Sequence, residues 1–322
     1  MLAAAAVSID AENPLSGLLV GEQPEPDPAP GWTTVDVKAA SLNHHDLWSL
    51  RGVGLGEKQL PMILGCDASG TDEDGNEVIV HSVIPTAGWM GDETFDPGRS
   101  LLSERHQGTL AERVAVPRAN LVAKPTELSF AEAACLPTSW LTAYRMLFSN
   151  SGTKPGDTVL IQGAGGGVAT ALIVLGVAAG LRVWVTSRSE QKREQAVALG
   201  AHAAFESGSR LPDRVDAVME SVGAATWAHS VKALRPGGTI VTCGATSGDS
   251  PSAELTRTFF LQLRVIGSTM GNRDELRQLS SYCVNTGVRP VIDSTVSLAD
   301  VADGLRRMEA GDVFGKVVVH IS

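Results

Sequence analysis

The chain has 322 residues, 43% of them hydrophobic and 19% charged, so it is long enough for two domains with sizeable cores and lacks the composition of a disordered protein. A net charge of −10 with scattered basic residues disfavours nucleic acid as a partner. The four cysteines form no Cys-x-x-Cys pair, which predicts neither a disulfide framework nor a zinc ribbon and favours a reducing cytoplasm. We expect no signal peptide, because the N-terminal segment has no basic residue and soon reaches Asp10 and Glu12. The apolar stretch 169–179 is too short to span a membrane.

The first third of the chain predicts short strands and turns. Residues 32–40 alternate weakly, residues 77–84 are strand-like, and residues 110–116 predict a strand that ends at Pro117. Prolines at 24, 26, 28 and 30 predict an extended early loop. Residues 85–107 have no clear periodicity, so we expect a long surface loop, a kind of segment that is often functional.

The pattern changes from Ser129 onwards to alternating strands and helices. Helices are expected at 130–135, 141–149, 168–179, 190–199, 225–234, 274–286 and 298–310, and strands at 158–162, 182–186, 215–219, 238–243, 264–267 and 316–321. Strands separated by such helices pair in parallel, because parallel pairing needs a crossover connection. We therefore predict an α/β protein with a doubly wound Rossmann sheet over 125–265, and a second domain from 1–124 and 266–322.

A glycine-rich turn follows the first strand of that sheet. It reads Gly163-Ala164-Gly165-Gly166-Gly167-Val168-Ala169, between an apolar strand and a helix expected to be amphipathic. Small residues let pyrophosphate oxygens approach bare N–H groups at a helix N-terminus, where the helix dipole favours anions. A strict G-x-G-x-x-G is not met, since the best register gives Ala164, Gly166 and Ala169. The context still predicts dinucleotide binding rather than a merely structural turn.

The end of the second strand indicates which dinucleotide is bound. An acidic residue there would accept hydrogen bonds from the ribose 2′-hydroxyl of NAD, but the chain has Thr186-Ser187-Arg188 and, one helical turn later, Lys192. Hydroxyls and cations suit a phosphate monoester, so NADP is favoured. The alternative is that Arg188 and Lys192 belong to a solvated helix start and pair with Glu190 or Glu194.

Several ordered motifs give the chain a resemblance to the medium-chain dehydrogenase/reductases, specifically to their zinc-free quinone oxidoreductase-like branch. Besides the glycine turn, the motifs are Ala40-Ser41-Leu42-Asn43-His44-His45-Asp46-Leu47, Leu64-Gly65-Cys66-Asp67-Ala68-Ser69-Gly70, Gly108-Thr109-Leu110-Ala111-Glu112, Leu136-Pro137-Thr138, Thr142-Ala143-Tyr144 and Phe314-Gly315-Lys316-Val317-Val318. The resemblance implies a GroES-like catalytic domain, a cofactor cleft between the domains, and dimers formed through the nucleotide domains.

The same resemblance bears on zinc. Positions that hold a catalytic zinc in the zinc-dependent relatives carry Asn43, Cys66 with Asp67, and Thr138, which is a poor zinc shell because Asn and Thr are weak ligands. Four closely spaced cysteines of a structural zinc lobe are absent, and residues 85–107 occupy that region. An unorthodox site is the alternative, since His44 and His45 align beside Cys66 and Asp67.

The resemblance also implies a catalytic set: Asn43, His44, His45, Asp46 and Trp48. Asn43 and Asp46 would lie near the nicotinamide, Trp48 would form an aromatic wall, and His44 or His45 would relay a proton to the product. Asn43 could equally only tie down its own loop, the histidines could be structural with water as the proton source, and Lys316 either supports the cleft or is a surface lysine.

Cofactor contacts are expected at the carboxyl ends of the Rossmann strands, where ligands of open α/β sheets bind. The candidates are Thr142, Gly163, Ala164, Gly165, Gly166, Gly167, Val168, Ser187, Arg188, Lys192, Ser221, Val222, Cys243, Gly244, Ala245, Ser268, Thr269, Met270 and Lys316. Thr142 would lie beside the nicotinamide ribose, and the run from Ser268 to Met270 would hold the carboxamide.

Together these features predict a soluble, cytoplasmic, NADPH-dependent oxidoreductase that transfers hydride to a quinone or α,β-unsaturated carbonyl without a catalytic metal. Conjugated acceptors spread the incoming charge, so hydrogen bonds and positioning can replace the Lewis acid that a plain ketone needs. We expect a homodimer that acts on a small molecule, with no nucleic-acid or membrane partner. The alternatives are a zinc-dependent alcohol dehydrogenase with an atypical site and a catalytically idle NADPH-binding protein.

Overall fold

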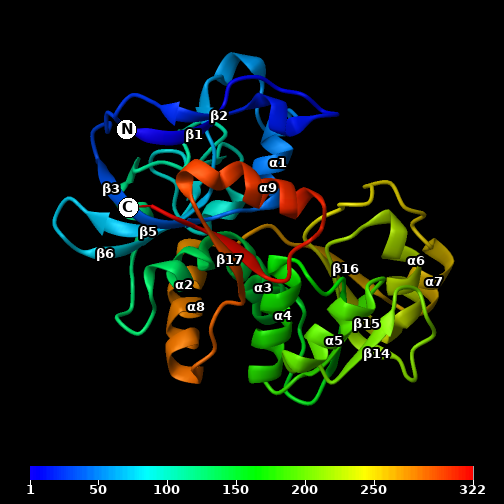
Figure 1. Cartoon of the computed structure of the whole chain (residues 1–322). Coiled ribbons are helices and arrows are strands. Elements are labelled where there is room, and N and C mark those ends of the chain that lie inside the picture. Colours follow the sequence, from blue (N-terminus) through cyan, green and yellow to red (C-terminus); the bar gives the residue numbers. More distant parts are fainter. Residues whose placement is uncertain (322) are drawn as a thin grey trace. The chain divides into compact units, whose positions relative to one another are not determined.

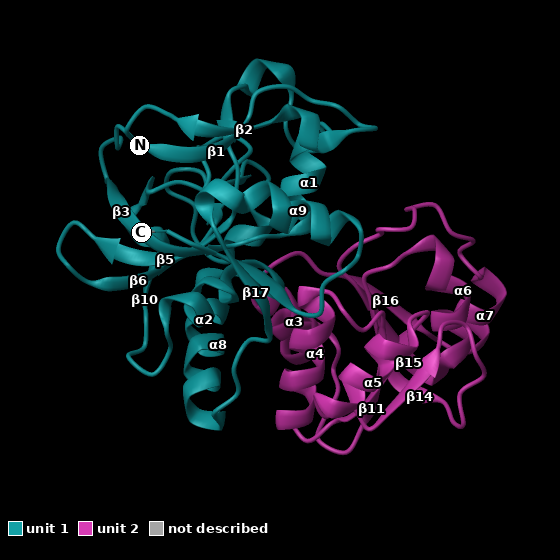
Figure 2. Ribbon diagram, viewed as in Figure 1, with its two compact units in different colours: residues 1–139, 271–322 teal, residues 140–270 magenta. Residues whose placement is uncertain are grey.

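The computed structural model describes residues 1–321 as two compact units (Figure 2). Unit 1 comprises residues 1–139 and 271–322, and unit 2 comprises residues 140–270. The sequence predicts the corresponding boundaries at 124/125 and 265/266. In the structure, helix α2 (Phe130–Ala134) packs on strands β3 (Trp32–Ser41) and β5 (Asp67–Asp72), which places it in unit 1.

Unit 1 is built around a seven-stranded, mostly antiparallel sheet with the order β10-β6-β5-β3-β18-β17, in which β9 also pairs with β3. The other strands of this sheet are β6 (Glu77–Val80), β9 (Arg113–Pro117), β10 (Leu121–Ala123), β17 (Ile292–Ser297) and β18 (Lys316–His320). Smaller sheets join β1 (Leu2–Ala6) with β2 (Leu18–Glu22) and β4 (Met62–Ile63), and β7 (Val83–Ile84) with β8 (Ser100–Leu101).

Strand β3 brings distant parts of the chain together. Its last residue, Ser41, pairs with Asp67 of β5 on one side and with Val318 of β18 on the other. Lys316 begins β18 and Asp67 begins β5. Register alone therefore places a serine, an aspartate and a lysine, from three distant segments, at one end of the sheet.

Four helices complete unit 1: α1 (His44–Leu50), α2, α8 (Arg273–Thr286) and α9 (Val301–Glu309). Helix α1 follows β3 directly and packs on α9 (Figure 1). Leu47 and Leu50 of α1 and Leu305 of α9 are buried in one core with the sheet. Single 3-10 turns lie at Pro14–Gly17, Glu57–Gln59, Glu93–Phe95, Arg118–Asn120 and Leu298–Asp300.

Unit 2 is a six-stranded, fully parallel sheet of order β13-β12-β11-β14-β15-β16, which confirms the predicted doubly wound fold. The strands are β11 (Thr158–Gln162), β12 (Arg182–Ser187), β13 (Ala203–Glu206), β14 (Val215–Glu220), β15 (Leu234–Thr242) and β16 (Arg264–Gly267). The order reverses between β11 and β14, and open α/β sheets bind ligands at such switch points.

In unit 2, one helix precedes the first strand and four lie in the connections between strands. They are α3 (Leu141–Tyr144), α4 (Gly167–Ala178), α5 (Glu190–Ala198), α6 (Ala224–Ala233) and α7 (Leu255–Phe260). Connections through α4 and α5 run in one direction along the sheet and those through α6 and α7 in the other, so the two pairs cover opposite faces. Two wider helical turns, Leu136–Trp140 and Arg145–Asn150, flank α3.

Some predicted elements need correction. Helix α4 is not amphipathic: the segment 169–173 is entirely buried, because the helix is enclosed on most sides. The stretch 77–84 is divided into β6 and β7, the strand expected at 110–116 starts only at Arg113, and the helix expected at 298–310 begins with a 3-10 turn. Short elements with weak hydrophobic periodicity were missed, namely α1, α7, β1, β2, β4, β5, β8, β10, β13 and β17.

Within residues 1–321, no helix combines the length and apolarity needed to cross a membrane.

Candidate active site

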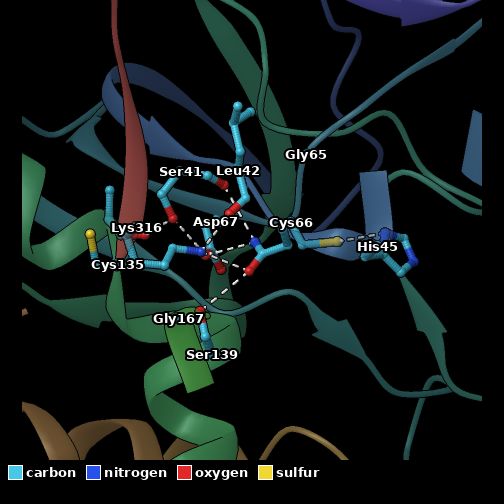
Figure 3. A network of polar contacts seen from close by, with 12 residues as sticks. Ser41, Leu42, His45, Gly65, Cys66, Asp67, Cys135, Ser139, Gly167 and Lys316 are labelled. Atoms are coloured by element: carbon cyan, nitrogen blue, oxygen red, sulfur yellow. Dashed lines mark hydrogen bonds and ion pairs between the residues drawn. The ribbon is translucent and has the colours of Figure 1, made fainter. Parts of the chain in front are cut away.

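A buried ion pair is the centre of a polar cluster in unit 1 (Figure 3). Lys316 Nζ lies 3.1 Å from Asp67 Oδ2, and the two side chains are only 2% and 0% exposed. The ammonium also donates to Leu42 O and to Asn43 Oδ1, both at 2.7 Å. Since a lysine ammonium has three hydrogens, these three bonds use all of its donors. Lys316 is therefore not the surface lysine that the sequence left open as an alternative.

The Asn43 side chain likewise uses all of its hydrogen-bonding groups within the cluster. Its Nδ2 donates to Asp67 Oδ2 at 2.8 Å and to Ser41 O at 3.3 Å, while its Oδ1 accepts from Lys316 and, at 3.4 Å, from Ser139 Oγ. An amide side chain offers two hydrogens and two lone pairs, and here all four are used. Ser41 Oγ completes the cluster with a 2.7 Å bond to Asp67 Oδ2. Of the two roles that the sequence allowed for Asn43, this geometry favours the positioning one.

Asp46 fixes the start of α1. Its Oδ2 accepts from the Asn43 backbone N–H at 2.8 Å in a capping box, and its Oδ1 accepts from Gly65 N–H at 3.0 Å. Burial raises the pKa of this carboxyl, and His45 opposes the rise. Asp46 thereby ties the loop that carries Asn43 to the loop that carries Cys66.

On the other side of the same loop, Cys66 and His45 form a second group. Figure 3 shows the Cys66 side chain directed away from Asp67 and towards His45. Cys66 Sγ lies 3.4 Å from His45 Nδ1 and 3.3 Å from Leu102 O. His45 Nε2 lies 3.0 Å from Glu104 Oε1, so this nitrogen carries a hydrogen. Although desolvation opposes it, contacts with Cys66 and Glu104 raise the pKa of His45 well above its usual value near 6.5.

The remaining predicted catalytic residues lie on α1. His44 is exposed in the first turn of the helix, and Trp48 is half-buried with the Arg51 guanidinium 5.8 Å from the centre of its ring. The cluster also contains residues that the sequence analysis did not select: Ser41, Ser103 and Glu104. Ser103 is buried and has a positive φ of 66°, a backbone conformation that the sequence around it does not predict.

In unit 2, the glycine turn leads from β11 into the N-terminus of α4. Gly163 has a φ of 87°, and Gly166 is the N-cap of α4 without a capping side chain. A Cβ on Gly166 would have no neighbour within 4 Å. The first N–H groups of this twelve-residue helix therefore have no side-chain cap from Gly166, and they lie at the switch point of the sheet, where open α/β sheets bind ligands.

The predicted 2′-phosphate residues adjoin this turn. A Cβ on Gly165 would lie 2.8 Å from Cδ and 2.9 Å from Nζ of Lys192, so the lysine covers the turn. Ser187 ends β12, and its carbonyl accepts from Arg193 at 2.8 Å. Arg188 follows it and is exposed. Arg193 was not selected from the sequence, although it fixes the strand end that carries Ser187.

The loops after β14 and β15 contact each other. A Cβ on Gly223 would lie 2.4 Å from Gly248 O and 2.9 Å from Ala245 Cα, which explains why only glycine fits at this φ of 90°. Val222 O accepts from Ser247 N at 2.7 Å. Ser221, Val222, Cys243, Gly244 and Ala245 thus form one surface at the carboxyl ends of neighbouring strands. Ser268, after β16, is held by Thr242 O and by Asn150 Nδ2, ahead of Thr269 and Met270.

Comparisons with known proteins agree with both units. Residues 29–126 match the family model of an alcohol dehydrogenase GroES-like domain, and residues 167–285 match that of a zinc-binding dehydrogenase. The chain is 30% identical to a zinc-type alcohol dehydrogenase-like protein of Leptosphaeria maculans over 92% of both sequences. It is 32% identical to 2-methylene-furan-3-one reductase of Solanum lycopersicum over 92% of this chain and 73% of the relative.

Among solved structures, that of an NAD-dependent alcohol dehydrogenase has a TM-score of 0.92 at 34% identity and covers 100% of both chains. The chain belongs to the medium-chain dehydrogenase/reductase superfamily. It is thus an oxidoreductase with a GroES-like domain, in unit 1, and the superfamily's Rossmann domain for a nicotinamide cofactor, in unit 2.

Because this superfamily includes zinc enzymes, the donors near Asp67 decide whether zinc fits. Zinc does not fit them. A catalytic zinc needs three nitrogen, sulfur or carboxylate ligands, whereas the Asn43 amide is fully used and the Cys66 thiol faces Leu102 O and His45. The Lys316 ammonium on Asp67 would also repel a dication. Throughout residues 1–321, no three His, Cys, Asp or Glu side chains gather as a metal-holding group.

Proposed function

We propose that this medium-chain dehydrogenase/reductase uses NADPH to reduce a quinone or an α,β-unsaturated carbonyl without a catalytic metal, like the zinc-free quinone oxidoreductase branch. The observation that carries the proposal is the Lys316–Asp67 ion pair. The Lys316 ammonium is bound to Asp67, at the position where the zinc-dependent relatives would hold a metal ion. Without a Lewis acid, a plain ketone loses several kcal/mol of charge stabilisation. A conjugated acceptor spreads that charge, so positioning and hydrogen bonds are sufficient.

For the cofactor, we infer NADP rather than NAD. No carboxylate stands at the end of β12, where Ser187, Arg188 and the nearby Lys192 offer one hydroxyl and two cations. Backbone N–H groups from Gly163 to Val168 would hold the pyrophosphate. Thr142, Ser221, Val222, Cys243, Gly244, Ala245, Ser268, Thr269 and Met270 remain the proposed contacts to the rest of the nucleotide. When bound, NADPH supplies the hydride.

Each predicted catalytic residue receives a separate task in this proposal. Lys316, Asn43 and Asp46 hold the loop before α1 and are positioning residues, because their polar atoms are bonded to one another and to backbone. Trp48 remains the proposed aromatic wall for the acceptor, and His44 remains the alternative proton relay. His45 would deliver the proton that completes the reduction.

The case for His45 rests on its contacts. The raised pKa favours the protonated ring, which would supply a proton as charge develops on the acceptor. Glu104, half-buried on the far side of the ring, would pass a replacement proton from water. Together with the hydride that bound NADPH would supply, this one proton from His45 would complete the two-electron reduction of an enone or a quinone.

The names of relatives support this proposal and also a second candidate. The 2-methylene-furan-3-one reductase is named for an enone, and this name supports a conjugated acceptor for the present chain. Two other similar proteins carry alcohol dehydrogenase names, which favours alcohol oxidation with NAD as the second candidate. The third, an idle NADPH-binding protein, shares the cofactor site but predicts no turnover.

The deciding experiment measures nucleotide oxidation by the purified protein with 1,4-quinones, 2-alkenals and simple ketones, and nucleotide reduction with alcohols. We expect NADPH oxidation with the first two classes only. Alcohol-dependent NAD reduction would establish the second candidate, and tight NADPH binding with no turnover across the panel would establish the third.

We also propose a homodimer formed through unit 2. Strand β16 is the edge of its sheet and carries exposed Val265, and α7 next to it exposes Leu255, Phe259 and Phe260. An apolar edge strand left in water is an aggregation site, so a second copy of the strand is a natural cover.

A further inference from the structure

A buried carboxylate at the end of β14 organises a polar network in unit 2. Glu220 is 0% exposed, and its Oε1 accepts from the backbone N–H groups of Val222 at 2.8 Å and Gly223 at 3.1 Å. Its Oε2 accepts from Ser230 Oγ at 2.6 Å, and Thr226 Oγ1 lies 2.9 Å from both oxygens. Every contact donates to the carboxylate, which compensates the large cost of burying a charge.

From Ser230 the network continues to the two preceding strands. Gln162 Nε2, at the end of β11, donates to Ser230 Oγ at 3.0 Å, and Gln162 Oε1 accepts from Thr186 Oγ1 of β12 at 2.6 Å. His229 Nε2 donates to Ser209 O at 2.9 Å, so its Nδ1 is the acceptor for the second Gln162 hydrogen at 3.0 Å. The donors therefore point in one direction, from Thr186 through Gln162 and Ser230 to Glu220.

Each strand-end member of this chain directly precedes a proposed cofactor contact. Gln162 precedes Gly163, Thr186 precedes Ser187, and Glu220 precedes the run Ser221–Val222. Strands β12, β11 and β14 are neighbours around the switch point of the sheet. Buried polar networks of this kind often add little net stability over apolar residues of similar volume, so stability alone does not explain why the network is there. The common property of its side chains is that they fix the three loops relative to one another.

We propose that Glu220 is a positioning residue for the dinucleotide. This proposal rests on the NADPH site proposed above. Glu220 holds the N–H groups of Val222 and Gly223. Through Ser230 and Gln162, it also couples this loop to the strand end that carries Ser187. The network makes the 2′-phosphate end and the loop after β14 parts of one rigid site. Selectivity for NADPH over NADH then depends on a residue that touches neither nucleotide.

The test is a double-mutant cycle on Glu220→Gln and Thr186→Val, with Kd for NADPH and NADH measured by titration calorimetry. A glutamine at 220 keeps one acceptor oxygen for Val222 and Gly223 but presents an amide N–H to Ser230. We expect each single variant to weaken NADPH binding about tenfold, as the loss of a buried charged or shared hydrogen bond does. The Kd for NADH should rise less than the Kd for NADPH. The double variant should bind NADPH no more weakly than whichever single variant binds it more weakly.

A matched control is Thr239→Val, which removes a buried hydroxyl from β15 that has no hydrogen-bond partner. It should leave both Kd values unchanged. Unchanged NADPH binding in folded Glu220→Gln, or single effects that simply multiply, would overturn the inference. Should Glu220→Gln fail to fold, Ser230→Ala takes its place in the cycle with the same expectations. If the wild-type chain binds neither nucleotide, the proposed function itself is wrong.

Discussion

The ammonium of Lys316 and the carboxylate of Asp67 are joined at 3.1 Å in the interior of unit 1, although they lie 249 positions apart in the chain. The pair is held by β18 and β5, the two strands that flank the end of β3. Low exposure removes the screening by water that makes surface ion pairs weak, and it also makes either charge costly to leave alone.

Removal of the ammonium should therefore destabilise unit 1 strongly. We expect Lys316→Met to lower the free energy of unfolding by about 3–5 kcal/mol, because Asp67 remains buried without its partner. The double variant Lys316→Met with Asp67→Asn should recover most of this loss. Urea unfolding followed by tryptophan fluorescence measures both, and Lys38→Met, at an exposed position of β3, is the control. Equal stability of Lys316→Met and the Lys38 control would contradict the ion-pair account.

The sequence predicted those elements whose signal lies within one segment of the chain, and it missed those that depend on contacts with distant segments. The parallel sheet of unit 2 was predicted because its strands are continuous apolar runs separated by helices, a signal that each segment carries by itself. The edge strand β13, with half-buried alanines, carries no such signal. Helix α7 buries none of its residues and was missed for the same reason.

The candidate site was predicted less completely. Motifs identified Asn43, Asp46 and Cys66, yet the saturation of Asn43 depends on where β18 places Lys316, which only strand register decides. Glu220 had one usable signal, an acidic residue at the end of an apolar strand and before a glycine loop. Such a residue needs several donors once it is buried, but the sequence does not show which ones.

Chelation should leave the activity intact. Asp67 Oδ2 already accepts hydrogen bonds from Lys316, Asn43 and Ser41, and the Lys316 ammonium would repel a metal dication here, so the proposed reaction uses no Lewis acid. We expect NADPH-dependent reduction of a 1,4-quinone to persist after dialysis against EDTA, with less than one zinc per ten chains by elemental analysis as an order-of-magnitude threshold. Activity that disappears with EDTA and returns with zinc would refute the metal-free proposal.

His45 should make the stability of unit 1 depend on pH. Contacts with Cys66 and Glu104, outweighing desolvation, raise the pKa of His45 above its unfolded value near 6.5. The stabilisation from protonation is thus fully present below about pH 6.5 and is lost as pH rises through the folded pKa. His45→Gln should flatten the dependence of the melting temperature on pH in this window. Identical slopes for the wild type and His45→Gln would be inconsistent with this account.

Cofactor selectivity should depend on Arg188 and Lys192. Each alanine variant is expected to raise KM for NADPH about tenfold or more, the usual effect of losing a hydrogen bond to a charged group, and to change KM for NADH little. Arg182→Ala removes an exposed arginine from the opposite end of the same strand and serves as the control. Parallel losses with both nucleotides would mean that the two cations do not recognise a 2′-phosphate.

A charged residue on the edge strand should abolish the proposed dimer. Val265 lies on β16 with 49% of its surface exposed, and the Phe259 and Phe260 side chains of α7 are more exposed still. In a dimer paired along β16, a Val265→Glu substitution would bring two like charges together at the interface and bury them, which costs several kcal/mol. Light scattering coupled to size exclusion should then give the mass of one chain for this variant and of two for the wild type. Val197→Glu, on an exposed apolar position of α5, should stay dimeric, and a wild-type chain that elutes with the mass of one would exclude the dimer altogether.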